Sequence, residues 1–166
     1  MTRTQQNQQL SFLQDKIKLI RSAIFFNLSD SVLKLPTSLV TTLKVDDFGY
    51  VWFFVKKPNK NLMDFETEFP VRLDYFKKGV DYFLQIMGKA MVVTDPEEIN
   101  SVLADAGQGL TLDSDMVLVK VKMLKAEFYE AQARAKSSWF SHALNSVTTW
   151  FRSPNSIGPN TYYPVS

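Results

Sequence analysis

A short basic segment holds the residue types best suited to chemistry. The segment Lys56-Lys57-Pro58-Asn59-Lys60-Asn61 directly follows an apolar stretch that reads as a buried strand. Phosphate groups are bound by cations together with amide or backbone N–H donors, and this segment supplies three ammonium groups and two side-chain amides. The segment therefore predicts a phosphate-binding turn. A solvated basic turn without a ligand is the alternative.

Several other kinds of active site are excluded. The sequence contains no cysteine, which rules out thiolate catalysis, disulfides and cysteine-ligated zinc. His142 is the single histidine and lacks the neighbouring acidic cluster that an ordinary metal site needs. No Gly-x-Ser-x-Gly, Gly-x-Gly-x-x-Gly or Walker sequence occurs. We therefore predict no metal site and assign no catalytic residue.

Length and composition bound the class of protein. A chain of 166 residues fits one domain that folds without disulfides or metals. With a net charge of +2, basic and acidic residues are too evenly balanced for a nucleic-acid-binding protein. No apolar run is long enough to span a membrane, and the polar start of the chain is no signal peptide. We expect a cytoplasmic protein.

The elements that position the basic segment are mainly strands. Asp46-Asp47-Phe48-Gly49 is a turn signal between Leu39–Val45 and Tyr50–Lys56, which predicts a hairpin. Both faces of Tyr50–Lys56 are apolar, so this strand should be covered on each side. Further strands are expected at Ala23–Leu28, Val71–Phe76, Tyr82–Val93 and Met116–Lys122. Within Tyr82–Val93, Gly88 predicts a bulge or a barrel corner.

Helices are expected at the ends of this series of strands. Leu10–Ile20 carries apolar residues at helical spacing, and Asp95 or Thr94 can cap a helix that stops at Gly107. Glu127–Arg152 reads as largely helical. Antiparallel neighbours joined by short turns predict a mainly β fold, a closed barrel with peripheral helices.

The expected organisation has four parts. They are a disordered polar N-terminus (1–9), the barrel domain (10–130), a C-terminal helix packing on the barrel or a partner (131–152) and an irregular tail (153–166).

Four segments resemble the pyridoxamine 5'-phosphate oxidase-like family, especially its general stress protein branch. Asp46–Lys56 resembles the family's Asp-Gly-x-Leu-Trp-Phe-Phe-Thr hairpin. Lys16–Phe26, Tyr82–Asp95 and Val117–Glu130 are similar to its entry helix and first strand, its glycine-containing strand and its closing strand, in the same order. The resemblance implies a six-stranded split barrel, like the FMN-binding proteins. It also implies a homodimer that holds flavin mononucleotide (FMN) in two clefts at the interface.

The resemblance also implies where FMN would bind. The family's Ser-Arg-Pro-Met motif falls on Thr37–Val40, so Ser38 stands where the family has arginine, and Val55 stands where it has threonine. Ser38 donates one uncharged hydrogen bond in place of an arginine fork, and Val55 has no hydroxyl. The residues expected to bind FMN are Ser38, Val40, Trp52, Phe53, Lys56, Lys57, Asn59 and Lys60.

Aromatic residues of the hairpin have two interpretations. Trp52 and Phe54 share one face of their strand and Phe53 takes the other. They could wall the flat flavin ring, or they could fill the core, which is the commoner role of aromatic side chains.

Three functions follow as hypotheses. The first is an FMN-binding, oxidoreductase-like homodimer, stress-related, with an unknown small-molecule substrate. The second is a non-enzymatic dimeric barrel that has lost flavin and binds another ligand or a protein. The third uses the apolar stripe over Leu144–Phe151 at a membrane surface, although this stretch has little sustained basic face.

Overall fold

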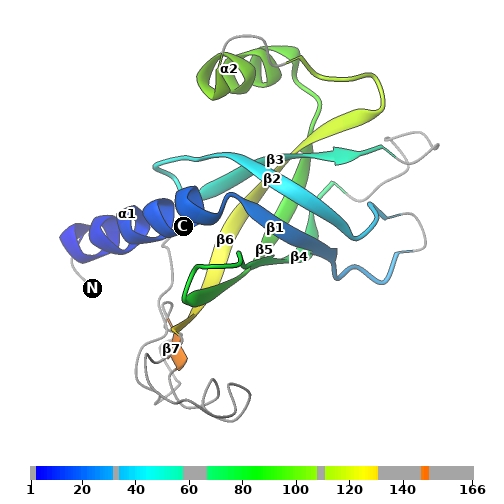
Figure 1. Cartoon of the computed structure of the whole chain (residues 1–166). Coiled ribbons are helices and arrows are strands. Elements are labelled where there is room, and N and C mark those ends of the chain that lie inside the picture. The colour runs from blue at the N-terminus through cyan, green and yellow to red at the C-terminus, as the bar shows by residue number, and fades with distance from the viewer. Residues whose placement is uncertain (1–2, 32–33, 58–66, 108–110, 131–146, 150–166) are drawn as a thin grey trace.

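Strands make up about half of the part of the chain that the computed structural model describes, residues 3–31, 34–57, 67–107, 111–130 and 147–149. The elements are α1 (Arg3–Ile20), β1 (Ser22–Asn27), β2 (Ser38–Val45), β3 (Tyr50–Lys56), β4 (Phe69–Tyr75), β5 (Tyr82–Val93), α2 (Pro96–Ala106), β6 (Met116–Glu130) and β7 (Val147–Thr149). Figure 1 shows a curved sheet with α1 extending from one side and α2 lying above the strands.

Six of these strands close into a barrel. The order in the sheet is β3-β2-β1-β4-β5-β6-β7, and every pair is antiparallel. A further pairing between β3 and β6, from Tyr50↔Lys122 to Lys56↔Met116, closes the ring. The predicted mainly β fold, a six-stranded barrel with peripheral helices, is confirmed.

The turn between β2 and β3 is organised by one carboxylate. Asp46 Oδ1 accepts hydrogen bonds from the backbone N–H groups of Phe48 and Tyr50, at 3.0 and 2.9 Å. Its Oδ2 accepts from Trp52 Nε1 at 3.0 Å. Gly49 adopts φ 79°, a left-handed conformation that glycine tolerates without a Cβ clash. The predicted hairpin is confirmed, with β3 bounded as expected.

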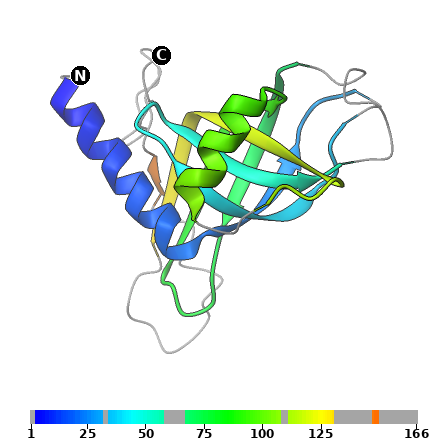
Figure 2. The same cartoon turned by 90° about the horizontal axis from the view of Figure 1, so that it is seen from above.

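Strand β3 is buried on both faces, as its sequence predicted. Val51, Phe53 and Val55 lie in the main core inside the barrel. Trp52 lies on the outer face in a second cluster, with Val93, Val102 and Leu118. Val102 comes from α2, which Figure 2 shows running across the outside of the strands. Helix α2 therefore supplies the outer cover that β3 requires.

Helix α2 begins and ends at the predicted signals. Asp95 is its N-cap, and the Asp95 carboxylate accepts from the N–H of Glu97 at 2.9 Å. Pro96 occupies the first turn, and Gly107 follows the last residue with φ 128°.

The main core also includes helix α1. Leu13, Ile17 and Ile20 are buried in the same cluster as the barrel interior. Inside the barrel, Thr42 Oγ1 and Tyr75 Oη share a 2.7 Å hydrogen bond, and burial raises the pKa of Tyr75. Neither α1 nor α2 is long and apolar enough to cross a membrane.

The bulge predicted at Gly88 is confirmed. The register between β5 and β6 shifts at Met87/Gly88, so that Leu124 is an extra residue on β6. A Cβ on Gly88 would lie 2.2 Å from the carbonyl oxygen of Lys122 and 2.8 Å from Val121 Cγ1. Only glycine allows this close approach of the two strands.

The largest differences from the prediction lie toward the two ends of the chain, and β1, β4 and β6 also differ in their bounds. Helix α1 begins at Arg3 rather than Leu10, because the polar lead-in contains no proline or glycine to stop a helix from propagating. The helix predicted over Glu127–Arg152 is wrong at both ends of that range. Strand β6 continues through Glu130, and Val147–Thr149 forms β7, which pairs with β6. Its β-branched Val-Thr-Thr sequence favours a strand. Residues 131–146 and 150–152 lie outside the described part.

We predict that Gly88→Ala lowers the free energy of unfolding by about 3 kcal/mol, because the new methyl group collides with backbone that cannot turn away. Denaturant unfolding followed by circular dichroism measures the change.

Gly79→Ala is the matched control, since Gly79 has φ 87° but a Cβ added there would have no atom within 4 Å. Gly79→Ala should lower the free energy of unfolding by only about 1 kcal/mol, the cost of holding a residue with a Cβ at positive φ. Equal losses in the two variants would contradict the close approach at Gly88.

Candidate functional site

Three of the residues expected to bind FMN lie at one end of the barrel. Ser38 begins β2, Lys56 ends β3, and Lys57 follows it. Because β2 and β3 are antiparallel, with Thr42 opposite Phe53, the start of β2 and the end of β3 lie toward the same end of the barrel. The start of β2 pairs with β1, with Ser38 opposite Phe25. A hydroxyl and two ammonium groups from two strands therefore share one end of the barrel.

The backbone around these lysines is fixed by the loop that precedes β6. The N–H of Lys57 donates to the carbonyl oxygen of Asp115 at 2.6 Å. Lys56 Nζ lies 3.9 Å from Asp115 Oδ2, and both side chains are mostly exposed. Such an exposed ion pair contributes little stability, so the Lys56 ammonium can turn to another anion. Ser38 Oγ donates to the carbonyl oxygen of Pro36 at 3.3 Å, a long bond.

The donor set at this end fits an anionic phosphate better than a neutral ligand. Of the two cations, Lys56 lies near the Asp115 carboxylate, and the half-buried Lys57 side chain makes no ion pair in the described part of the chain. The site lacks the planar fork of an arginine, so any phosphate is held by point charges and a hydroxyl.

Val40, Trp52 and Phe53 do not join this group through their side chains. Val40 and Phe53 belong to the barrel interior, as does Val55. Trp52 is 5% exposed, and its indole is fixed by Asp46 and covered by α2. The contacts within one chain therefore agree with the packing interpretation of these aromatic residues. Any contribution of Val40 or Phe53 to a ligand would come from their backbone.

Asn59 and Lys60 lie outside the described residues, and so does His142.

A row of lysines on the outer face was not singled out as functional by sequence. Lys44 Nζ lies 5.5 Å and Lys120 Nζ 5.3 Å from the centre of the Trp52 ring. Lys44 also pairs with Asp105 and Lys120 with Glu98, each at 2.6 Å. Both acids belong to α2, so these lysines attach the helix to the barrel rather than offering free charge to a ligand.

The outer face of β1, β4 and β5 carries a half-buried polar cluster. The guanidinium of Arg72 lies 4.3 Å from the centre of the Phe26 ring, and its Nε is 3.1 Å from Asp74 Oδ1. That Nε atom is buried but makes no well-aligned hydrogen bond to any residue that the structure describes. Asp74 Oδ1 also accepts from Gln85 Nε2 at 3.0 Å.

Tyr129 extends this cluster onto β6. Its hydroxyl donates to Glu127 Oε2 at 2.9 Å. Burial, together with the hydrogen bond and charge of Glu127 and the charge of Asp74, raises the pKa of Tyr129 to about 12. The tyrosine is therefore a neutral donor at physiological pH.

Comparison with known proteins shows the same fold. The chain is similar to the general stress FMN/FAD binding protein from Xanthomonas citri, with 22% identity and a TM-score of 0.54 over 78% of this chain and 93% of that one. It is also similar to a Clostridium acetobutylicum protein related to general stress protein 26 of B. subtilis (pyridoxinephosphate oxidase family). That match has 11% identity and a TM-score of 0.55 over 75% of this chain and 89% of that one. No curated protein sequence matches the chain.

The family comparison covers most of the sequence. The family described as Pyridoxamine 5'-phosphate oxidase like matches residues 8–150, a span that includes all six barrel strands and α2. The chain belongs to the pyridoxamine 5'-phosphate oxidase-like family.

Proposed function

We propose that this protein is an FMN-binding, oxidoreductase-like homodimer whose flavin phosphate is held at the end of β2 and β3. The observation that carries the proposal is the position of Ser38, Lys56 and Lys57 at the same end of the barrel. Family membership and the likeness to a general stress FMN/FAD binding protein support it.

The residues of the site would have separate roles. Lys57 is the principal phosphate cation, because it is half-buried and its side chain has no competing acid in the described part of the chain. Lys56 adds charge after leaving Asp115, and Ser38 adds one hydroxyl donor. When bound, FMN supplies the hydride and electron chemistry, while the protein binds, orients and shields it.

A second copy of the chain would cover the outer face of β1, β2, β4 and β5. Leu39 is 74% exposed and Met87 36% exposed, although both lie on strands. The buried Nε of Arg72 lies 3.1 Å from Asp74 Oδ1 but makes no well-aligned hydrogen bond to the described residues, and such atoms are rarely left unpaired. Exposed apolar side chains beside an unsatisfied polar atom support an interface on this face.

Another function is favoured by Ser38 and Val55. Losing the family's arginine and threonine removes charge-assisted and hydroxyl bonds, each of which contributes roughly 1.5–3 kcal/mol when a charge is involved. The chain would then be a non-enzymatic dimeric barrel that binds another ligand or a protein.

We predict that the protein binds FMN saturably and that Lys57→Ala raises the Kd about tenfold, because one charge-assisted bond is lost. Quenching of flavin fluorescence during titration measures both values.

Lys78→Ala is the control, since Lys78 is exposed after β4, at the other end of the barrel. It should leave the Kd unchanged. A wild-type protein that does not quench FMN fluorescence would overturn the flavin proposal and favour the non-enzymatic barrel.

For the interface, we predict that the protein has twice the 19.0 kDa chain mass and that Leu39→Glu shifts it toward the monomer. A carboxylate at this position must be desolvated in the dimer but not in the single chain. Size-exclusion chromatography with light scattering measures the mass.

Phe48→Glu is a matched control, because Phe48 is 77% exposed in the turn between β2 and β3. It should leave the mass unchanged. A wild-type protein that is monomeric at micromolar concentration would refute the homodimer.

A further inference from the structure

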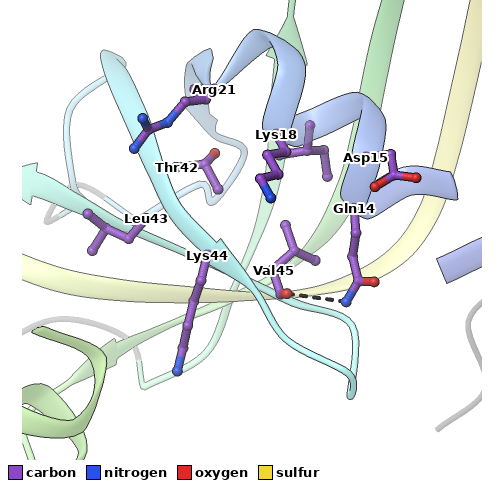
Figure 3. A pocket seen from close by; sticks show the side chains of 9 residues that line it. Gln14, Asp15, Lys18, Arg21, Thr42, Leu43, Lys44 and Val45 are labelled. Carbon is purple, nitrogen blue, oxygen red and sulfur yellow. Dashed lines mark hydrogen bonds between the residues drawn. The ribbon is translucent and has the colours of Figure 1, made fainter. Parts of the chain in front are cut away.

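A pocket separates α1 from the second half of β2. Its volume is about 620 Å³, within the range of roughly 300–1,000 Å³ typical of small-molecule sites. Figure 3 shows α1 contributing one wall and β2 the other. The lining residues are Gln14, Asp15, Ile17, Lys18, Arg21, Thr42, Leu43, Lys44 and Val45. The pocket adjoins the opposite half of β2 from Ser38, so it is separate from the proposed flavin phosphate site.

Two cations at this pocket are not engaged elsewhere. Lys18 and Arg21 make no hydrogen bond or ion pair through their side chains in the described part of the chain. The third, Lys44, pairs with Asp105 and points toward α2 in Figure 3. The only acid among the lining residues is Asp15. The pocket therefore carries net positive charge on the side formed by the end of α1.

Arg21 is held in a conformation that ordinarily selects glycine. Its φ is 63°, and it is the only residue other than glycine in the described ranges with positive φ. Its N–H donates to the carbonyl oxygen of Ile17 at 2.7 Å, and its carbonyl oxygen accepts from the N–H of Thr42 at 2.8 Å. Both backbone polar groups of Arg21 are therefore hydrogen-bonded, which fixes the backbone from which its side chain extends.

The facing strand is irregular at the same place. The register between β2 and β3 shifts between Thr42 and Lys44, which makes Leu43 an extra residue on β2. Bulges of this kind re-aim side chains and are common beside binding sites. Leu43 and Val45 are half-buried, and with the buried Ile17 they give the pocket an apolar side.

A simpler explanation covers only part of these observations. Cations at a helix C-terminus offset the helix dipole, which accounts for a basic residue near the end of α1. It does not account for arginine at φ 63°, because glycine would end the helix there without strain. It also leaves the pocket and the bulge unexplained.

We propose that this pocket binds a small organic molecule with a phosphate or carboxylate group. Lys18, whose ammonium points into the space between α1 and β2 in Figure 3, holds the anionic oxygens through charge-assisted hydrogen bonds. The Arg21 guanidinium points away from Lys18 in Figure 3 and turns to join it, adding paired hydrogen bonds from its planar group. Ile17, Leu43 and Val45 contact the apolar part of the molecule. The same pocket thus offers cations to the anionic group of the molecule and apolar side chains to the rest of it.

The test is a titration of the full chain with inorganic phosphate and with phenyl phosphate, at constant ionic strength and followed by amide resonances. Both probes should shift the signals of residues 14–21 and 42–45. Phenyl phosphate should bind at least several-fold more tightly, because its ring removes apolar surface from water.

Arg21→Gly is the decisive variant, since glycine accepts φ 63° and removes the cation without disturbing the backbone. It should keep or raise the Tm while weakening phenyl phosphate binding at least tenfold. Lys18→Gln should also weaken binding, whereas Lys89→Gln should not, because Lys89 lies on β5 away from the pocket.

Two results would overturn the proposal. One is the absence of saturable shifts in the pocket residues, including the case in which only signals near Lys57 move. The other is unchanged affinity in Arg21→Gly. Neither result depends on FMN, so the pocket and the flavin site can fail separately.

Discussion

Strand β6 has to pair on both edges, and the barrel depends on this. Over residues 118–122 it pairs with β3 on one edge and with β5 on the other. Past Met123 it leaves β3 but continues along β5 as far as Glu130, and Glu127–Tyr129 pair with β7. The bulge at Leu124 lies where β6 changes partners, and Gly88 lets the Lys122 carbonyl approach β5 at that point. A side chain at Gly88 would push apart the strands whose contact closes the ring.

Closure of the ring determines what the rest of the chain can do. Once β3 lies between β2 and β6, its side chains alternate between the interior and the outer face, and both need cover. Barrel packing covers one face, and α2 covers Trp52 on the other. Lys56 at the end of β3 is exposed, and it lies with Lys57 at the same end of the barrel as the start of β2. The candidate phosphate site is thus a consequence of where the strands stop.

Local signals in the sequence predicted much of this fold. Asp46–Gly49 marked the hairpin, Asp95 and Pro96 marked the start of α2, and Gly88 marked the bulge. Each of these residues acts on its own backbone or an adjacent strand, so its type alone indicates its role. The two apolar faces of Tyr50–Lys56 likewise predicted cover on each side, although not which element supplies it.

What the sequence did not predict depends on contacts between distant residues. The sequence leaves Trp52 open to two roles, a ligand wall or the commoner core role, and its bond to Asp46 and its cover by α2 show the packing role. Strand β7 is set by pairing with β6 rather than by helical spacing, which misled the prediction for that segment. Arg21 looks like an ordinary basic residue after a helix. Its positive φ and its place at a pocket are visible only in three dimensions.

The central claim is that this barrel carries a flavin. The visible absorption spectrum of the freshly purified full chain tests it most directly. The spectrum is recorded once on the intact protein and once on the supernatant after heat denaturation, which releases any bound small molecule. We predict that the intact protein shows the two-band spectrum of an oxidised flavin. When the protein is denatured, the flavin should appear in the supernatant as FMN. A colourless protein that stays colourless after incubation with FMN and removal of the excess would contradict the account.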